Sequence, residues 1–231
     1  YPAGVPAEIN PSEYRSLREV IEQAIAQHRD RPCFTCMDRT LTYGDLDVLA
    51  TRFAAYLQQI ARLRKGDRIA LMLPNVLLYP VAILGAFRAG LTIVNTNPMY
   101  TPRELQHQLH DSGARAILIL ENFAHTLAEV QHDVHLDTVI VTGVGDLLAF
   151  PKSLLVNFVL RHVKKQVPEY SLPGAVSLTE ALSKGRYENL ERVELGHEDI
   201  AFLQYTGGTT GVSKGAVLTH RNLIANVLQS E

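Results

Sequence analysis

The chain has few cysteines, no excess of basic residues and no long apolar runs. Its 231 residues include two cysteines, and 22 Lys and Arg stand against 24 Asp and Glu. The resulting net charge of −2 offers no basic surface for nucleic acid, so we expect no nucleic-acid partner. No apolar run approaches the ~20 residues of a transmembrane helix. We expect a globular protein located in the cytoplasm.

Neither the cysteines nor the histidines form a metal-ligand pattern. Cys33 and Cys36 have CxxC spacing, but a zinc site would need a second pair of ligands. Residues 32–37 are predicted to be a strand, which directs these two side chains to opposite faces. We therefore expect ordinary buried thiols. Three histidines lie close in sequence without an HExxH pattern, and we expect surface positions and no metal site: His125, His132 and His135.

One segment near the C-terminal end has the composition of a phosphate-binding loop. Residues 205–216 read YTGGTTGVSKGA, with four glycines, four hydroxyl side chains after the tyrosine, and one lysine. Glycine lets backbone N–H groups surround an anion, and lysine adds a mobile positive charge. The alternative is a flexible Gly/Thr hairpin, which needs no lysine. The candidate ATP-phosphate ligands are Tyr205, Thr206, Gly207, Gly208, Thr209, Thr210, Gly211, Val212, Ser213, Lys214, Gly215 and Ala216.

The flanking residues distinguish this loop from a Walker A loop. Residues 200–205 and 216–219 are short apolar runs that predict strands, so the loop joins two strands. A Walker A loop joins a strand to a helix and has glycine directly before its lysine, where this chain has Ser213. Thr219 is a candidate N-cap for a following helix. We expect His220 to belong to that helix's first turn and not to catalysis.

Apolar strands alternate with amphipathic helices through most of the chain. This alternation predicts an α/β fold, with a layered parallel sheet covered by helices on both faces. We assign residues 1–199 to this subdomain and expect residues 200–231 to begin an incomplete second sheet in the next subdomain, which carries the loop. The strands are expected at 68–73, 92–95, 116–120 and 138–142. The helices are expected at 17–26, 42–57, 79–88, 101–112 and 124–130, with caps at Ser16, Thr42 and Thr101.

An amphipathic segment interrupts this alternation and forms an insertion over residues 147–170. If Pro151 opens a helix, apolar side chains between 154 and 163 cover a wide arc. Four polar residues form a separate stripe: Asn157, Arg161, Lys164 and Lys165. A broad apolar face beside a basic one is typical of a helix lying in a membrane interface. The alternative, a core helix with a solvated basic stripe, is equally compatible with the pattern.

Several motifs together resemble the acyl-adenylate-forming enzymes, and among them the bacterial long-chain fatty-acid–CoA ligases. They are YTGGTTGVSKGAVLTHRN from residue 205, LTYGDLD at 41–47, RKGDRIALMLPN at 64–75 and AGLTIVNTNPMYTPREL at 89–105. Their order and spacing match that family over essentially the whole chain. One departure is Ser213, where many members have proline; this removes some rigidity but no phosphate donor.

The resemblance implies an ATP-dependent ligation of a long-chain fatty acid to coenzyme A, with Mg²⁺ and an acyl-adenylate intermediate. It also implies that residues 205–216 hold the ATP phosphates and that no catalytic residue lies in this chain. A long-chain substrate would suit peripheral contact with the inner face of a membrane through residues 147–166. Two alternatives stay open: another acyl-, aryl- or amino-acid-adenylating enzyme, and a nucleotide-binding module without catalysis.

The chain is shorter than members of that family, so we expect it to be the N-terminal part of the large adenylating domain. The adenine, ribose and adenylation-lysine motifs would then lie beyond residue 231. We expect the chain alone to be inactive and to self-associate through its uncovered C-terminal strands. The glycine-rich residues 207–213 have no apolar anchor, and we expect them to be mobile without ligand.

Overall fold

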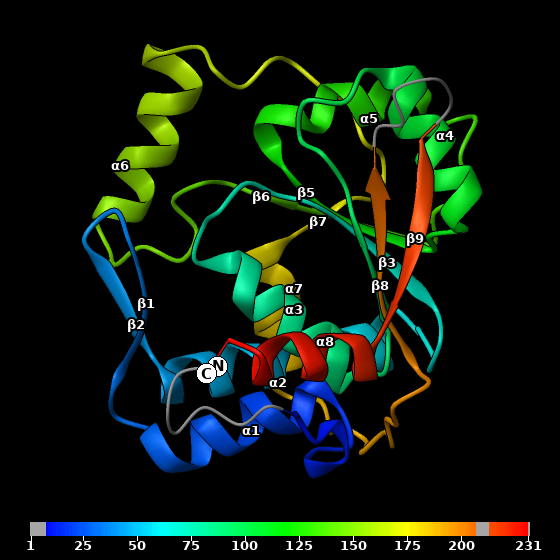
Figure 1. Cartoon of the computed structure of the whole chain (residues 1–231). Helices are drawn as coiled ribbons and strands as arrows, with labels where there is room; N and C mark the ends of the chain where they lie inside the picture. Colours follow the sequence, from blue (N-terminus) through cyan, green and yellow to red (C-terminus); the bar gives the residue numbers. More distant parts are fainter. Residues whose placement is uncertain (1–7, 207–212, 231) are drawn as a thin grey trace.

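The computed structural model describes residues 8–206 and 213–230 and confirms the α/β class (Figure 1). The strands are β1 (Pro32–Cys36), β2 (Arg39–Thr42), β3 (Arg68–Met72), β4 (Thr92–Asn95), β5 (Ala116–Leu120), β6 (Thr138–Thr142), β7 (Val176–Ser177), β8 (Ile200–Thr206) and β9 (Lys214–Thr219). The helices are α1 (Leu17–His28), α2 (Tyr43–Ala55), α3 (Leu78–Arg88), α4 (Pro102–Ser112), α5 (Ala124–Val130), α6 (Lys152–Phe158), α7 (Leu178–Gly185) and α8 (His220–Leu228). Two short 3-10 helices are η1 (Pro11–Glu13) and η3 (Glu121–Phe123), and two short π-helices are η2 (Tyr56–Ile60) and η4 (Val159–Val163).

The described strands form one large sheet and one hairpin. The large sheet has the order β7-β6-β5-β3-β4-β8-β9, and all its neighbours are parallel except β8 and β9. The second sheet expected to begin at residue 200 therefore does not stand apart. Instead β8 pairs with β4, with Phe202 opposite Ile93 and Leu203 opposite Val94. These apolar side chains extend the cores on both faces of the sheet, so β8 is stable there.

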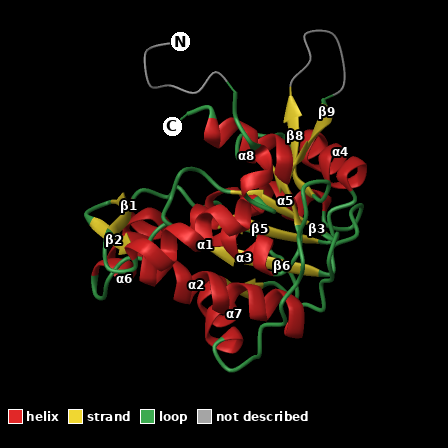
Figure 2. Cartoon of the chain, turned by 60° about the horizontal axis from the view of Figure 1, so that its bottom comes forward, coloured by secondary structure: helices red, strands yellow, loops and turns green. Residues whose placement is uncertain are grey.

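Helices cover both faces of the sheet, as the alternating pattern predicts (Figure 2). Within β3, Ile69 and Leu71 pack in the core with α1, α2, α3 and α7, whereas Ala70 and Met72 pack with α4 and α5. This division follows from the two-residue period of a strand. Burial on both faces explains why the central strands are continuous apolar runs.

The predicted helix caps are also confirmed. Ser16, Thr42, Thr101 and Thr219 each accept a hydrogen bond from the backbone N–H three residues later. Such a cap satisfies one of the N–H groups that a helix start leaves without a partner. The strands β2 and β7 and the helix α7 lie in segments for which the sequence pattern predicted no element.

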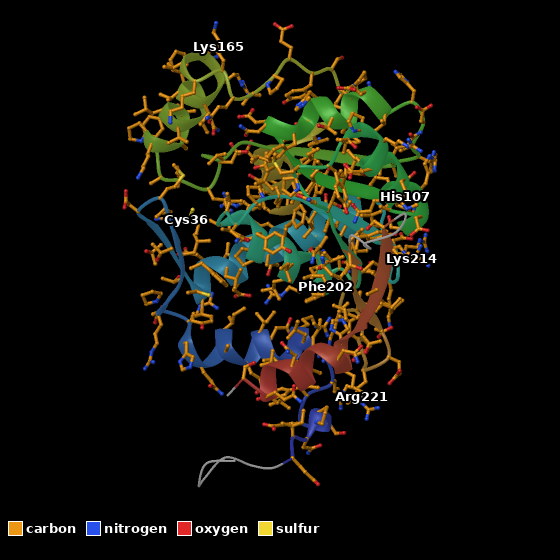
Figure 3. The ribbon with its side chains drawn as sticks, turned by 45° about the horizontal axis from the view of Figure 1, so that its top comes forward. Cys36, His107, Lys165, Phe202, Lys214 and Arg221 are labelled. Atoms are coloured by element: carbon orange, nitrogen blue, oxygen red, sulfur yellow. The ribbon has the colours of Figure 1, made fainter. Side chains whose placement is uncertain are left out.

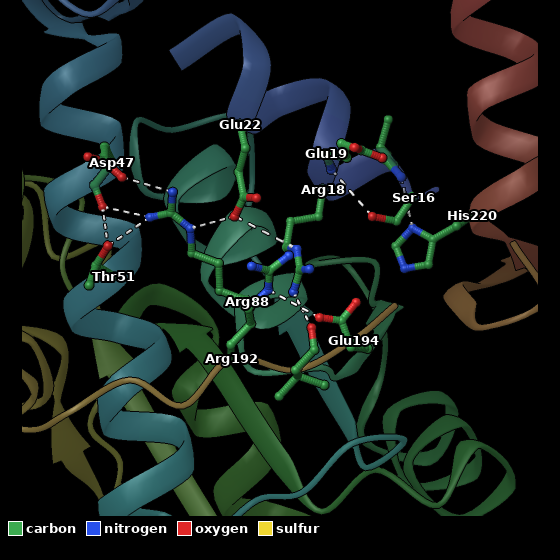
Figure 4. Close-up of polar contacts among 12 residues, drawn as sticks. Ser16, Arg18, Glu19, Glu22, Asp47, Thr51, Arg88, Arg192, Glu194 and His220 are labelled. Carbon is green, nitrogen blue, oxygen red and sulfur yellow. Dashed lines mark hydrogen bonds and ion pairs between the residues drawn. The ribbon is translucent and has the colours of Figure 1, made fainter. Parts of the chain in front are cut away.

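Polar contacts join helices α1, α2 and α3 on one face of the sheet (Figure 4). Arg88, at the end of α3, donates to the carboxylate of Asp47 at 2.8 Å and to the hydroxyl of Thr51 at 2.8 Å, both on α2. It also donates to Glu22 of α1 at 3.3 Å. Burial raises the pKa of Asp47, but hydrogen bonds from Arg29 and Arg88 outweigh it and lower that pKa below its usual value. Arg88 therefore fixes the spacing of α1, α2 and α3.

His220 connects the two ends of the described chain. It is the first residue of α8, as predicted, and it is fully buried. Its Nδ1 accepts a hydrogen bond from the backbone N–H of Leu17 at 3.3 Å, which ties α8 to α1 (Figure 4). Its ring also packs edge-on against Phe87, with 4.9 Å between centroids. The arrangement supports a structural role for this histidine.

The amphipathic segment forms α6 and η4, and its apolar side chains point outward. Leu154, Leu155 and Phe158 are 64%, 61% and 58% exposed. Asn157, which was expected on a solvated stripe, instead donates to Asp146 at 2.8 Å and accepts from a backbone N–H at 2.7 Å. The core-helix interpretation is therefore wrong for this structure, because α6 has no buried residue and Asn157 attaches it to the loop that follows β6.

A second polar attachment and the β1–β2 hairpin complete this region. Arg161 of η4 pairs with the buried carboxylate of Glu121. The hairpin lies beside α6 (Figures 1 and 2). Lys152 of α6 donates a hydrogen bond to the backbone carbonyl of Met37 in the hairpin at 2.6 Å. Met37 and Phe34 add exposed apolar area next to α6. Among the described residues, no helix is both long enough and apolar enough to cross a bilayer.

Candidate phosphate-binding site

The predicted loop starts from the end of β8 and returns as β9, the edge strand of the sheet. Tyr205 and Thr206 end β8, and Thr206 lies opposite Lys214 in the antiparallel ladder. The prediction that the loop joins two strands is therefore confirmed. Residues 207–212, which include Gly207, Gly208 and Thr209, lie outside the described residues. The expectation that the loop is mobile without ligand concerns these same residues, so it also lies outside the described part of the chain.

The base of the loop lies at the carboxyl ends of the parallel strands. A pocket of about 260 Å³ opens there between β3, β4 and β8. In sheets of this kind ligands bind at the carboxyl ends of strands whose connections run in opposite directions. Here the chain passes from β3 to its neighbour β4, and from β4 it returns past β3 to β5, which lies on the opposite side of β3 in the sheet. The lining residues are Leu71, Leu73, Tyr79, Asn95, Thr96, Asn97, Tyr100, Gln204 and Tyr205.

A chain of polar side chains crosses this pocket. The hydroxyl of Tyr79 donates to Asn95 Oδ1 at 2.8 Å, and Asn95 Nδ2 donates to Gln204 Oε1 at 2.9 Å. Asn95 accepts one of these bonds and donates the other, so its amide group is held between Tyr79 and Gln204. Sequence reasoning did not single them out. Their only signal is that Asn95 and Gln204 are polar residues within otherwise apolar strands.

Tyr205 is held firmly at the start of the loop. Its side chain is 8% exposed, and its hydroxyl donates to Asp111 of α4 at 2.5 Å. Burial and the hydrogen bond to Asp111 raise the pKa of Tyr205 well above its usual value. The hydroxyl therefore stays protonated and donates to Asp111, so in this structure Tyr205 anchors β8.

Ser213 closes the other end of the loop. Its hydroxyl donates to the carbonyl of Thr206 at 2.9 Å, which bridges the two strand ends. His107 Nε2 lies 3.1 Å from the carbonyl oxygen of Ser213. A carbonyl only accepts hydrogen bonds, so Nε2 carries the hydrogen. The Ser213 side chain thus ties the two ends of the loop to each other.

Lys214 is the positive charge beside this base. It is exposed and takes part in none of the ion pairs found among the described residues. Its ammonium group is therefore available to an anion. Figure 3 shows Lys214 and His107 near each other on β9 and α4. Gly215 and Ala216 follow Lys214 in β9.

His107 and Asp111 contact the two ends of the loop, and the sequence analysis did not predict these contacts. Both belong to the predicted helix 101–112, on its polar side. A histidine and an aspartate on such a face usually indicate a solvated surface. Only the packing of α4 beside β8 and β9 reveals that they touch the loop ends.

The described part of the chain offers no evident metal site. No three His, Cys, Asp or Glu side chains in it gather closely enough to hold a metal ion. Cys33 and Cys36 are free thiols, and they are half-buried where full burial was expected.

Comparison with known proteins defines the class. The family model described as AMP-binding enzyme matches residues 21–231, and the chain belongs to this family. A long-chain-fatty-acid–CoA ligase of Escherichia coli O157:H7 is 54% identical over 229 residues, covering 99% of this chain and 41% of the relative. Its counterpart from Haemophilus influenzae is 51% identical over 231 residues, covering 100% and 41%. The chain thus spans about two fifths of these relatives.

Solved structures agree with the fold. A crystal structure of a long-chain-fatty-acid-CoA ligase from Archaeoglobus fulgidus has a TM-score of 0.73 and 26% identity, covering 100% of this chain and 41% of that one. An anthranilate CoA ligase in complex with anthranoyl-AMP has a TM-score of 0.74 and 19% identity, covering 92% and 37%. The second likeness supports the fold alone.

Proposed function

We propose that the protein containing this chain joins a long-chain fatty acid to coenzyme A at the expense of ATP. The observation that carries the proposal is the 54% identity, over 99% of the chain, to relatives named for this ligation. Membership in the AMP-binding family supports the adenylate step. The division into a subdomain of residues 1–199 and the start of a second from residue 200 belongs to the same proposal, with β8 and β9 as strands shared with the sheet of the first.

The proposed chemistry has two steps. A carboxylate is a poor electrophile, so its oxygen first attacks the α-phosphorus of ATP. The bond from the α-phosphorus to the oxygen that bridges it to the β-phosphate breaks. Pyrophosphate departs, and the product that remains is an acyl-adenylate. The sulfur of coenzyme A then attacks the acyl carbon, the bond to the phosphate oxygen breaks, AMP leaves, and the thiol proton passes to solvent. Mg²⁺ would accompany ATP and neutralise part of its charge.

Residues 205–216 would hold the β- and γ-phosphates while pyrophosphate leaves. Lys214 supplies a positive charge and the glycines let backbone N–H groups approach. Their contribution is electrostatic stabilisation and positioning, which is the main source of rate in such transfers. No nucleophile or general base is required of this chain. By itself, the chain is expected to bind ATP weakly and to show no ligase activity.

We further propose that the protein works in the cytoplasm with α6 touching the membrane. The outward apolar side chains and the nearby basic residues Lys164 and Lys165 support this, because anionic headgroups attract lysine beside an inserted apolar face. A membrane-partitioned fatty acid would be collected there.

The test is ATP–pyrophosphate exchange and acyl-CoA formation by the full-length protein. We expect exchange that depends on palmitate, followed by palmitoyl-CoA when coenzyme A is added. Exchange with benzoate or an amino acid, and none with palmitate, would favour another adenylating enzyme. Binding of ATP without exchange for any acid would leave only a nucleotide-binding module.

A further inference from the structure

Helix α4 contacts the chain on both sides of the predicted phosphate loop. Asp111 accepts the hydrogen bond from Tyr205, in the strand that enters the loop. His107 donates to the carbonyl of Ser213, just before the strand that leaves it. A single helix therefore holds both ends of the loop.

The two anchoring side chains come from one face of a well-fixed helix. His107 and Asp111 are four residues apart, which places them one above the other. Leu105 and Leu109 of the same helix are buried against the sheet. A capping box with Thr101 starts the helix and a left-handed glycine ends it. α4 is thus a rigid support for the two contacts.

The loop base itself is cross-linked between these anchors. The Ser213 hydroxyl donates to the Thr206 carbonyl at 2.9 Å, so the strand ends cannot separate without losing this bond. Burial of the Tyr205 ring adds a packing contact on the entering strand. Together the contacts fix where the loop leaves the sheet and where it returns.

We propose that His107 and Asp111 are positioning residues for ATP. By holding the ends of residues 205–216, they set how Lys214 approaches the phosphates. A segment fixed at both ends loses less conformational freedom when it binds, so its affinity is greater. The inference rests on the proposed function and deepens it, because it assigns an ATP-specific role to two residues outside the glycine-rich motif.

The test uses the full-length protein and pyrophosphate exchange with palmitate. His107→Leu and Asp111→Ala are each expected to raise the KM for ATP about three- to tenfold, the range of one lost hydrogen bond. The KM for palmitate is expected to stay within about twofold in the same assay. His107→Gln keeps an N–H donor at similar reach and should restore the wild-type KM.

His110→Ala is the matched control, because His110 lies on the exposed side of the same helix. Tyr205→Phe gives an independent variant that keeps the ring but removes the hydroxyl, and it should behave like Asp111→Ala. An unchanged KM for ATP in all three loss variants would overturn the proposal. Equal increases in both KM values would also overturn it, since they indicate general disruption. A wild-type protein without palmitate-dependent exchange would refute the proposed function itself, and the inference with it.

Discussion

The ring of Tyr205 lies against Gly215 on the neighbouring strand, so close that a Cβ atom at residue 215 would stand 3.0 Å from two ring carbons. The two residues are partners in the antiparallel ladder. With Asp111 holding the hydroxyl, the ring has little room to move aside. Gly215 is therefore required by packing, in addition to the backbone freedom that its motif suggests.

Gly215→Ala is expected to destabilise the protein by ~1–3 kcal/mol, the usual cost of overpacking. Thermal unfolding of the full-length protein measures the loss. Gly196→Ala is the control, because a Cβ atom there would meet only an Asp199 oxygen at 4.0 Å. Equal unfolding temperatures for the two variants would show that the ring moves aside freely.

Lys214→Ala should slow pyrophosphate exchange by roughly 10²-fold, as expected when a charge that stabilises the transition state is removed. Gly208→Val should also slow it, by the steric argument made for the motif. Lys184→Ala is the control, since Lys184 forms only a surface pair with Glu180. Unchanged exchange in both loop variants would exclude this segment as the phosphate site.

His220 is expected to make the fold acid-sensitive. Burial lowers its pKa to about 4; Asp199 opposes this shift, while Arg18 and Lys65 add to it. The unfolded histidine binds a proton near pH 6.5. Its contribution to stability is thus complete above about pH 6.5 and is lost as the pH falls toward 4, up to ~3 kcal/mol.

Urea unfolding between pH 7 and pH 4.5 measures this loss. His220→Asn keeps an acceptor near the Leu17 N–H but cannot titrate, so its stability should vary less with pH than that of the wild type. Parallel curves for the two proteins would assign the acid sensitivity to other groups.

Replacing Leu154, Leu155 and Phe158 with serine should weaken binding of the full-length protein to anionic liposomes several-fold, since each lost apolar side chain removes buried area. ATP-dependent adenylation of a soluble fatty acid should stay intact. The control is Val48 and Tyr187 to serine, which are exposed elsewhere. Equal co-sedimentation of the triple variant and this control would remove α6 from the membrane proposal.

The 231-residue chain alone should self-associate through β9. This strand lies at one end of the sheet order, and Val217 in it is 53% exposed. An exposed edge strand pairs readily with another chain. Light scattering should therefore show a dimer or larger species, and Val217→Lys should shift it toward monomer. A monodisperse wild-type monomer would contradict the expectation.

Local patterns in the sequence determined most of the elements. Apolar runs at 68–73 and 116–120 specify buried strands, and threonine three residues before an acidic or amide residue specifies a helix start. The glycines, hydroxyls and lysine of residues 205–216 identified a candidate phosphate site without any coordinates. Each of these signals lies within a few adjacent residues, so a linear sequence carries it.

Tertiary structure decided what depends on residues distant in sequence. The sequence could not place β8 beside β4, because pairing of strands about 108 residues apart depends on how both apolar faces are covered. The sequence also left the orientation of α6 open. Asn157 points inward because it binds Asp146, and Arg161 of η4 does so because it pairs with Glu121. Neither partner can be identified from the sequence pattern. The contacts of α4 with both loop ends likewise exist only once helix and sheet are packed together.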